Sequence, residues 1–154
     1  MVSRFVRPQE WTEDTIGHKA EKCLLRLLAR LGVKADKGTD FEDLHFGADL
    51  WVRFRGQLIP VQLTCESDRD RRGLKVQKAE KYGVAFVHIT FFDVSRSMSY
   101  QTAAKRVMDS LREQLDQYLS LRGAPTLTRE GCYQSELNWV SRNGNTFQPQ
   151  RRAV

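Results

Sequence analysis

The chain has 154 residues, of which 40% are hydrophobic and 29% are charged. This length and composition are typical of one globular domain and exclude a fibrous or an intrinsically disordered chain. Lysine and arginine outnumber aspartate and glutamate by 25 to 19, which gives a net charge of +6 and an isoelectric point near 9.5. A basic excess of this kind suits a polyanionic partner such as nucleic acid.

The apolar segments and the cysteines of the sequence indicate in which cellular compartment the protein is expected. No run of about 18 apolar residues, as a membrane span requires, is present, and residues 1–10 lack the apolar stretch of a signal peptide. Cys23, Cys65 and Cys132 are odd in number and form no Cys-x-x-Cys pair, so neither a disulfide framework nor a zinc ribbon is predicted. We therefore expect a cytoplasmic protein that does not bind membranes.

Residues 12–31 have the pattern of an amphipathic helix. Thr12 can cap its start, and Gly32 follows its last apolar residue. Glu21 falls at the edge of the apolar face. The residues predicted to be buried are Ile16, Ala20, Cys23, Leu24, Leu27, Leu28 and Leu31.

A short strand at 33–39 and a β-hairpin follow. Residues 48–55 and 58–64 alternate between apolar and polar side chains, as half-buried strands do. Between them, Gly56-Gln57 suits a two-residue hairpin turn.

This turn sets the expected register of the hairpin. It pairs Arg55 with Leu58, and therefore Asp49 with Thr64. Because directly opposed residues share a face, and Gln62 is two residues from Thr64, the three polar residues of the hairpin are predicted to project from the same side.

The second half of the chain alternates helices with one strand. Residues 65–73 are predicted to form a polar loop, 74–82 a short helix and 84–92 a buried strand. The strand, helix, strand order implies a parallel pair. A long helix is expected from a cap at Ser97 or Ser99 to about Leu121.

The first helix and the hairpin together carry four polar residues in a particular order along the chain. Glu21 lies on the helix, Asp49 in Gly-Ala-Asp-Leu-Trp-Val opens one strand, and Gln62 and Thr64 lie in Val-Gln-Leu-Thr in the other. Over residues 12–92 this order resembles the PD-(D/E)xK phosphodiesterase superfamily, above all its Mrr-type restriction nucleases and archaeal Holliday-junction resolvases. Gln-Lys-Ala-Glu-Lys-Tyr, which ends at Tyr82, resembles the helix that follows the motif in resolvase-like members.

The resemblance implies a restriction-endonuclease-like core. This is an α/β fold in which a mixed β-sheet with a central hairpin is flanked by α-helices. We expect residues 1–125 to form one domain. Residues 126–154 contain apolar residues among polar ones, so we expect a C-terminal extension that packs on this domain and has a frayed end. Whether two copies of the chain form a homodimer is left open.

The same resemblance implies metal-dependent hydrolysis of DNA. A hard cation, Mg²⁺ or Mn²⁺, takes oxygen ligands, neutralises developing charge and holds the attacking water. Asp49 would be its principal ligand, assisted by Glu21 and by the side-chain carbonyl of Gln62.

The sequence departs from the family where a lysine should follow. Thr64 stands at that position and brings no charge, so Lys75 on the next helix is the best candidate for a relocated lysine, with Lys78 second. Glu66 could replace the acid that Gln62 lacks. These candidate site residues also have non-functional interpretations. Asp49 could belong to a turn, and Lys75 could be a surface lysine.

Residues 69–81 are basic and offer a surface for phosphates. Arg69, Arg71, Arg72 and Lys78 are the predicted nucleic-acid contacts, although such a segment can also be a solvated helix face. The alternative function is a catalytically inactive module of the same fold that binds nucleic acid or a protein partner.

Other chemistries find less support. His18, His45 and His88 have no ligand-like spacing with the cysteines, which argues against zinc. The acidic residues between Asp40 and Asp49 do not match the spacing of an EF-hand loop.

Overall fold

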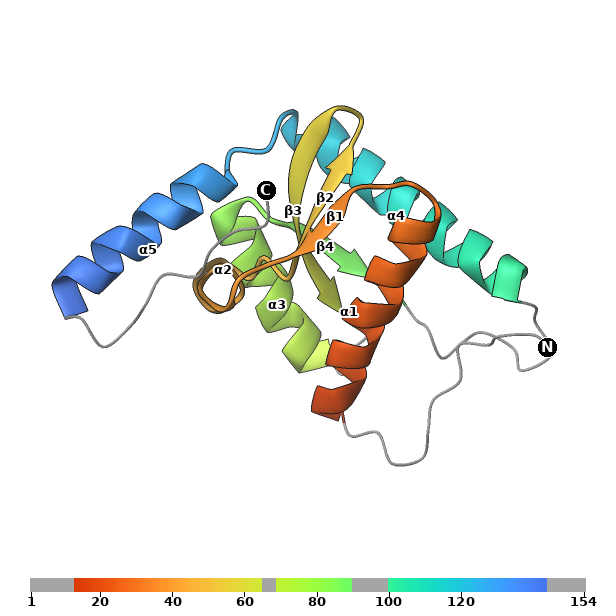
Figure 1. Cartoon of the computed structure of the whole chain (residues 1–154), viewed down its shortest axis with the longest axis horizontal. Coiled ribbons are helices and arrows are strands. Elements are labelled where there is room, and N and C mark those ends of the chain that lie inside the picture. Colours follow the sequence, from red (N-terminus) through yellow and green to blue (C-terminus); the bar gives the residue numbers. More distant parts are fainter. Residues whose placement is uncertain (1–12, 65–68, 90–99, 144–154) are drawn as a thin grey trace.

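A four-stranded sheet in the order β1-β2-β3-β4 lies at the centre of the molecule. The computed structural model describes residues 13–64, 69–89 and 100–143, with side chains within 21–64, 73–89 and 101–143 (Figure 1). The strands are β1 (Ala35–Lys37), β2 (Leu50–Phe54), β3 (Gln57–Thr64) and β4 (Ala85–His88). The helices are α1 (Glu13–Arg30), α2 (Asp40–Phe46), α3 (Arg69–Tyr82), α4 (Tyr100–Arg122) and α5 (Arg129–Asn143). The first three strands are antiparallel neighbours and β4 is parallel to β3, which confirms an α/β fold with a mixed sheet.

The main hydrophobic core lies between one face of this sheet and helices α1 and α4. Alternate hairpin residues point into it, Leu50 from β2 and its partner Val61 from β3. The helices contribute residues at helical spacing: Leu24, Leu27, Leu28, Val107, Met108, Leu111 and Leu115. Leu31 was expected in this core but is 52% exposed, because α1 ends at Arg30 and Gly32 turns the chain at φ 74°.

The hairpin turn lies one residue earlier than the sequence predicts. Its residues are Arg55 and Gly56, with φ of 50° and 75°, rather than Gly56 and Gln57. Positive φ at both positions is a type I′ arrangement, which is uncommon for a non-glycine residue such as arginine. Leu58 therefore pairs with Arg53, not Arg55. The shift of two residues is even, so every side chain keeps its predicted face.

Helix α2 was not predicted, although its signals are present. The Thr39 hydroxyl accepts a hydrogen bond from the Glu42 backbone N–H at 3.1 Å, and Glu42 Oε1 accepts one from the Thr39 N–H at 2.8 Å. This reciprocal capping box begins the helix, and Gly47 at φ 75° ends it.

Helix α3 begins earlier than expected. Residues 69–73 are helical rather than part of a polar loop, whereas 65–68 lie outside the described residues. α2 and α3 lie on the side of the sheet opposite the main core, where Gly47 packs against the side chains of Gln62 and Lys78. The expected strand at 84–92 is described only as far as residue 89.

The C-terminal extension contains α5, which is attached through its first residue. Arg129 Nη2 lies 3.2 Å from Glu42 Oε1, and Nη1 lies 3.5 Å from Asp36 Oδ2. The Arg129 guanidinium also lies 5.6 Å from the ring centre of Trp51, and Cys132 packs in a second buried cluster with the same ring. Residues 144–154 lie outside the described part of the chain.

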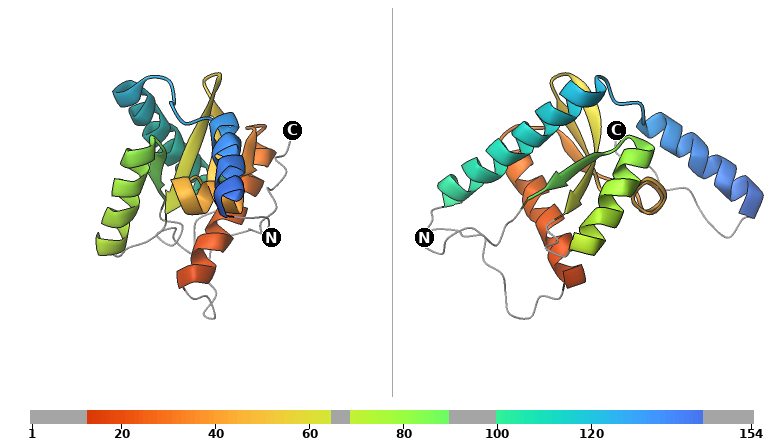
Figure 2. Two further views of the ribbon diagram at one scale, coloured as in Figure 1. Left: turned by 90° about the vertical axis from the view of Figure 1, so that its left-hand side faces the viewer. Right: turned by 180° about the vertical axis from the view of Figure 1, so that it is seen from behind.

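Helix α4 covers the free edge of β4. The Gln114 side chain accepts a hydrogen bond from the His88 N–H and donates one to the His88 carbonyl, both at 2.8 Å. The C-terminal half of α4 also lies near the hairpin (Figure 2). There, Arg55 Nε of the turn lies 2.6 Å from Asp116 Oδ1. Among the described helices, none is both long and apolar enough to cross a membrane.

Candidate functional site

Three buried polar residues of the hairpin lie on the face opposite the main core. Asp49, Gln62 and Thr64 are 6%, 7% and 2% exposed. Gln62 Nε2 donates a hydrogen bond to Asp49 Oδ2 at 2.8 Å, so the prediction that these two side chains share a face is confirmed. Thr64 follows two residues later in β3 and shares it too.

The backbone around Asp49 is fixed on both sides. Its N–H donates to the Val61 carbonyl at 2.8 Å, and its carbonyl accepts from the Gly38 N–H at 2.7 Å. Asp49 Oδ2 accepts a second hydrogen bond from the Leu63 N–H at 3.0 Å. The carboxyl group is thus oriented before any ligand arrives.

The surroundings of Asp49 oppose its negative charge. Burial, a hydrogen bond with Asp43, and the charges of Asp43 and Glu21 together raise its pKa from 3.8 to about 10, and the Leu63 N–H acts weakly in the other direction. A hydrogen bond between two carboxyl groups requires a proton on one of them. Three carboxyl groups from α1, α2 and the start of β2 therefore influence one another at this point.

Asp43 is the member of this group that is not predicted from the sequence. It lies on α2, and without that helix the residue belongs to an acidic stretch of unassigned structure. The spacing of Thr39 and Glu42, which is that of a capping box, is the signal that could have placed Asp43 on a helix ending beside Asp49.

The orientation of Gln62 depends on a close approach by Gly47. A Cβ atom at Gly47 would lie 2.6 Å from Gln62 Oε1, so the amide oxygen faces the Gly47 backbone and the nitrogen faces Asp49. In this arrangement Gln62 acts as a hydrogen-bond donor to the Asp49 carboxyl group. For its oxygen to reach a cation beside Asp49, as predicted from the resemblance, the amide would have to turn over.

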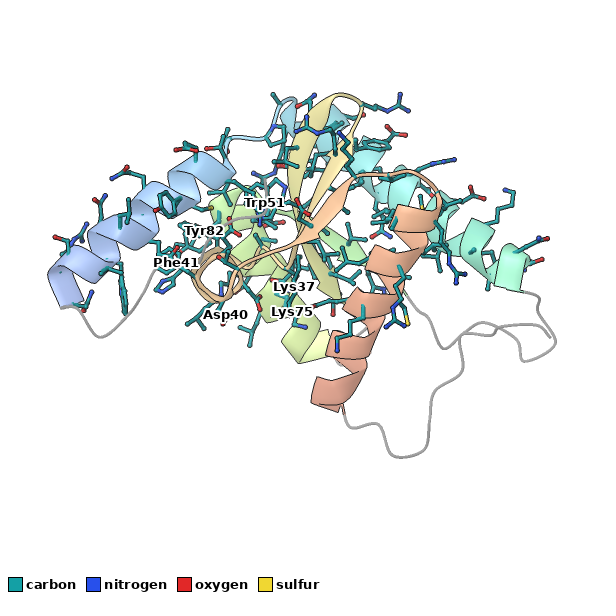
Figure 3. The ribbon with its side chains drawn as sticks, in the orientation of Figure 1. Lys37, Asp40, Phe41, Trp51, Lys75 and Tyr82 are labelled. Atoms are coloured by element: carbon teal, nitrogen blue, oxygen red, sulfur yellow. The ribbon has the colours of Figure 1, made fainter. Side chains whose placement is uncertain are left out.

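The lysines of α3 differ in their environments. Lys78 Nζ donates to the Leu44 carbonyl at 2.6 Å and so joins α3 to the end of α2. Lys75 is half-buried, and its ammonium group has no hydrogen-bond or ion-pair partner in the described part of the chain (Figure 3). Arg69, Arg71 and Arg72 are helical residues of α3, but their side chains, like Glu66 as a whole, lie outside what the structure describes.

His88 is a further polar group on this face. It is the parallel partner of Thr64 at the end of β4. Its Nε2 is buried and has no hydrogen-bond partner among the described residues. From the sequence, His88 could be assessed only as a zinc ligand, because its pairing in register with Thr64 is a tertiary feature.

The donor set fits a hard cation better than a soft one. Asp49, Asp43 and Glu21 offer carboxylate oxygens, and Mg²⁺ is commonly held by one or two carboxylates with water completing its shell. Within the described side chains, no three His, Cys, Asp or Glu residues already stand in a geometry that would hold a metal. Asp43 already lies within hydrogen-bonding distance of Asp49, so a cation here would take the place of the proton between these two carboxyl groups.

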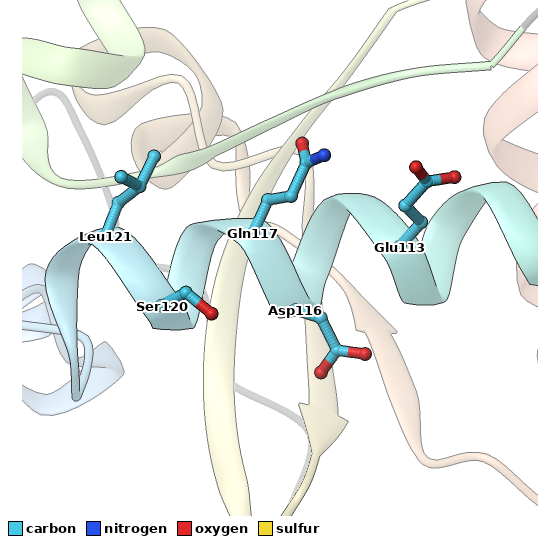
Figure 4. A pocket seen from close by; sticks show the side chains of 5 residues that line it. All are labelled: Glu113, Asp116, Gln117, Ser120 and Leu121. Carbon is cyan, nitrogen blue, oxygen red and sulfur yellow. The ribbon is translucent and has the colours of Figure 1, made fainter.

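A surface hollow of about 560 Å³ lies along α4, away from Asp49. Figure 4 shows that its residues all project from this one helix. They are Glu113, Asp116, Gln117, Ser120 and Leu121. Leu121 is 87% exposed and Asp116 is paired with Arg55, so this surface offers no convergent set of chemical groups.

Comparison of the chain with protein-family models, with curated proteins and with solved structures finds no significant match.

Proposed function

We propose that the chain is a metal-dependent phosphodiesterase that hydrolyses DNA. The observation that carries this proposal is the buried, pre-oriented Asp49 carboxyl group with Asp43 and Glu21 beside it. Buried carboxyl groups of like charge are unfavourable unless a proton or a cation compensates them, and clusters of this kind occur most often at functional sites.

The roles of the residues follow from their positions. Mg²⁺ or Mn²⁺, when bound, would neutralise charge on the scissile phosphate and lower the pKa of a bound water. Asp49 would be the principal ligand and Glu21 or Asp43 the second, with Gln62 fixing the Asp49 carboxyl group. Lys75, whose ammonium group is unpaired within the described residues, would stabilise charge on the phosphate.

DNA is the proposed partner because the sequence of α3 is rich in basic residues. Arg69, Arg71, Arg72 and Lys78 lie on α3 and would contact phosphates. A cytoplasmic location belongs to the same proposal, and association of two copies stays open within it.

Metal binding and cleavage provide the test. We expect the wild-type protein to bind Mn²⁺, followed by electron paramagnetic resonance, and to cleave at least one of branched, double-stranded or single-stranded DNA. Asp49→Asn should abolish both, whereas Lys75→Ala should lower kcat by a factor on the order of 100 to 1,000 at unchanged Mn²⁺ affinity.

Asp109→Asn is the matched control, because Asp109 is an exposed aspartate of α4 paired only with Lys105 in the described region. This variant should bind metal and cleave DNA like the wild type. DNA cleavage that survives Asp49→Asn would refute the assignment of the site.

One observation favours the rival function of an inactive module. Thr64, at the expected lysine position, is neutral and 2% exposed, and the Gln62 amide presents its nitrogen to Asp49. The rival predicts no Mn²⁺ binding at millimolar metal by a correctly folded protein that still binds DNA or a protein partner.

A further inference from the structure

A cavity of about 250 Å³ lies between α2, the end of α3 and α5, and rings dominate its walls. Phe41 and Tyr82, two of these residues, are labelled in Figure 3. The rings are Phe41, His45, Phe46, Tyr82 and Trp139, and Ser135 and Arg142 complete the lining. None of these residues was predicted as part of a site.

The rings support one another, so the walls are formed in advance. Phe41 and His45 are stacked with centroids 4.1 Å apart, and the Trp139 ring meets both at an angle, at 6.3 Å and 5.8 Å. Phe46 and Tyr82 make an edge contact at 5.3 Å. Trp139 is nevertheless 36% exposed, so this residue reaches the surface at the cavity.

One cationic side chain lines the cavity and another lies beside one of its rings. The Arg142 guanidinium lines it and has no ion-pair partner among the described residues. Lys81 Nζ lies 5.2 Å from the centre of the Tyr82 ring. No acidic residue of the described chain lines the cavity. An ammonium ligand, which aromatic cages otherwise attract, is therefore disfavoured, and a flat ligand that carries negative charge is favoured.

We propose that this cavity holds an unpaired base of single-stranded DNA, with Arg142 and Lys81 contacting the adjoining phosphates. Aromatic side chains that stack with bases beside cationic groups are the usual means of binding single strands. The choice of DNA rests on the proposed function, but the cavity itself is a separate feature from the carboxyl groups. The two are neighbours, because Phe46 precedes Gly47, whose backbone packs against Gln62.

Binding measured without metal tests this proposal. Fluorescence anisotropy in EDTA would compare a labelled oligothymidylate with a blunt duplex of equal length. Trp139→Ala should weaken binding of the oligothymidylate by a factor on the order of 10 to 100 and leave duplex binding unchanged. Leu137→Ala is the matched control, because Leu137 lies on the same helix, is also 36% exposed and does not line the cavity.

A second pair of variants separates a specific contact from a general decrease in positive charge. Arg142→Ala should weaken oligothymidylate binding, whereas Arg106→Ala, on the exposed surface of α4, should not. Circular dichroism checks that each variant is folded. Because Arg142 is exposed, its replacement keeps the test valid even where Trp139→Ala unfolds α5.

Each result decides the proposal. Equal effects of Trp139→Ala and Leu137→Ala on the oligothymidylate, or equal weakening of both DNA forms by Trp139→Ala, would overturn it. Thymidine monophosphate that competes as well as the oligothymidylate would show a site for free nucleotides and overturn it too. If these binding results are as expected but no DNA is cleaved, the proposed hydrolysis is wrong and the proposed base-binding cavity stands. If DNA is cleaved but the binding results are not as expected, only the proposal for the cavity is wrong.

Discussion

The Asp49 carboxyl group shows how single residues determine the character of the proposed site. Both hydrogen bonds to its Oδ2 come from neutral donors, the Gln62 amide and the Leu63 N–H. Neutral donors orient a carboxylate but do not cancel its charge, and Asp43 and Glu21 add negative potential. In the metal-free protein these surroundings raise the pKa of Asp49 and so favour its protonated form in the folded state.

A pH dependence of stability follows for the metal-free protein. The pKa of Asp49 rises from its ordinary value of 3.8, expected in the unfolded chain, to about 10 in the folded protein. The stabilisation from its protonation is therefore complete below about pH 4 and is lost as the pH rises toward 10. In EDTA, the free energy of unfolding of the wild type should fall relative to that of Asp49→Asn, by up to about 1.4 kcal/mol per pH unit. Urea unfolding at several pH values measures this difference, and parallel curves would contradict it.

The same residue shows what could be inferred without a structure. Side chains alternate between the two faces of a β-strand. Asp49, Gln62 and Thr64 therefore stay on one face when the hairpin register shifts by an even number of residues. The contribution of Asp43 and the orientation of the Gln62 amide could not be inferred, because both depend on how α2 and Gly47 pack against the hairpin.

At the level of elements, backbone conformation at two glycines distinguishes a turn from a helix. Gly56 sits at φ 75° in the hairpin turn, whereas Gly73 lies inside α3 without a positive φ. Apart from its chain neighbours and, at Gly73, the backbone of its own helix, a Cβ atom at either position would have no atom within 4 Å. Any effect of an added methyl group therefore comes from the backbone and not from a clash.

Opposite effects on stability are expected from the same substitution. Gly56→Ala should lower the free energy of unfolding by about 1–2 kcal/mol, because alanine resists the left-handed region. Gly73→Ala should raise it by about 1 kcal/mol, because alanine favours a helix interior. Chemical denaturation of the two variants measures both values. A change of the same sign in both would show that backbone conformation does not control these positions.

Elements with strong periodicity were predictable and those without it were not. α1 and α4 repeat apolar residues at helical spacing against one core. The exact turn was missed because the positive φ of Arg55 reflects the twist of the paired strands rather than a preference of arginine. α5 was missed as a helix because its buried residues are Cys132 and Glu136, while its apolar residues Leu137 and Trp139 are partly exposed.

At the scale of the whole molecule, the charge of +6 gives the proposed DNA binding a measurable signature. Each phosphate that a protein neutralises releases counterions, so the logarithm of affinity falls with the logarithm of salt concentration by about 0.9 per neutralised phosphate. Such interactions position a protein on DNA without reading its sequence.

Removing charge from α3 should make this salt dependence shallower. The double variant Arg71→Ala/Arg72→Ala should weaken binding to all DNA sequences about equally and reduce the slope by about 0.9 for each phosphate that is no longer neutralised. Affinity measured at several salt concentrations gives the slope. Arg106→Ala/Arg112→Ala removes the same charge from the exposed side of α4 and should have no such effect. Equal slopes for the wild type and both double variants would indicate that residues 71 and 72 are only solvated.

The Gln114 side chain limits how this molecule can assemble. A free strand edge is a template onto which another chain can add a strand, and unprotected edges lead to aggregation. At the end of β4, the Gln114 amide already occupies both hydrogen-bonding positions of His88, while β1 at the opposite edge offers only three residues. A partner that joined by β-augmentation would have to displace this amide or rely on a very short ladder. Association through helix surfaces is therefore favoured over a continuous sheet shared between chains.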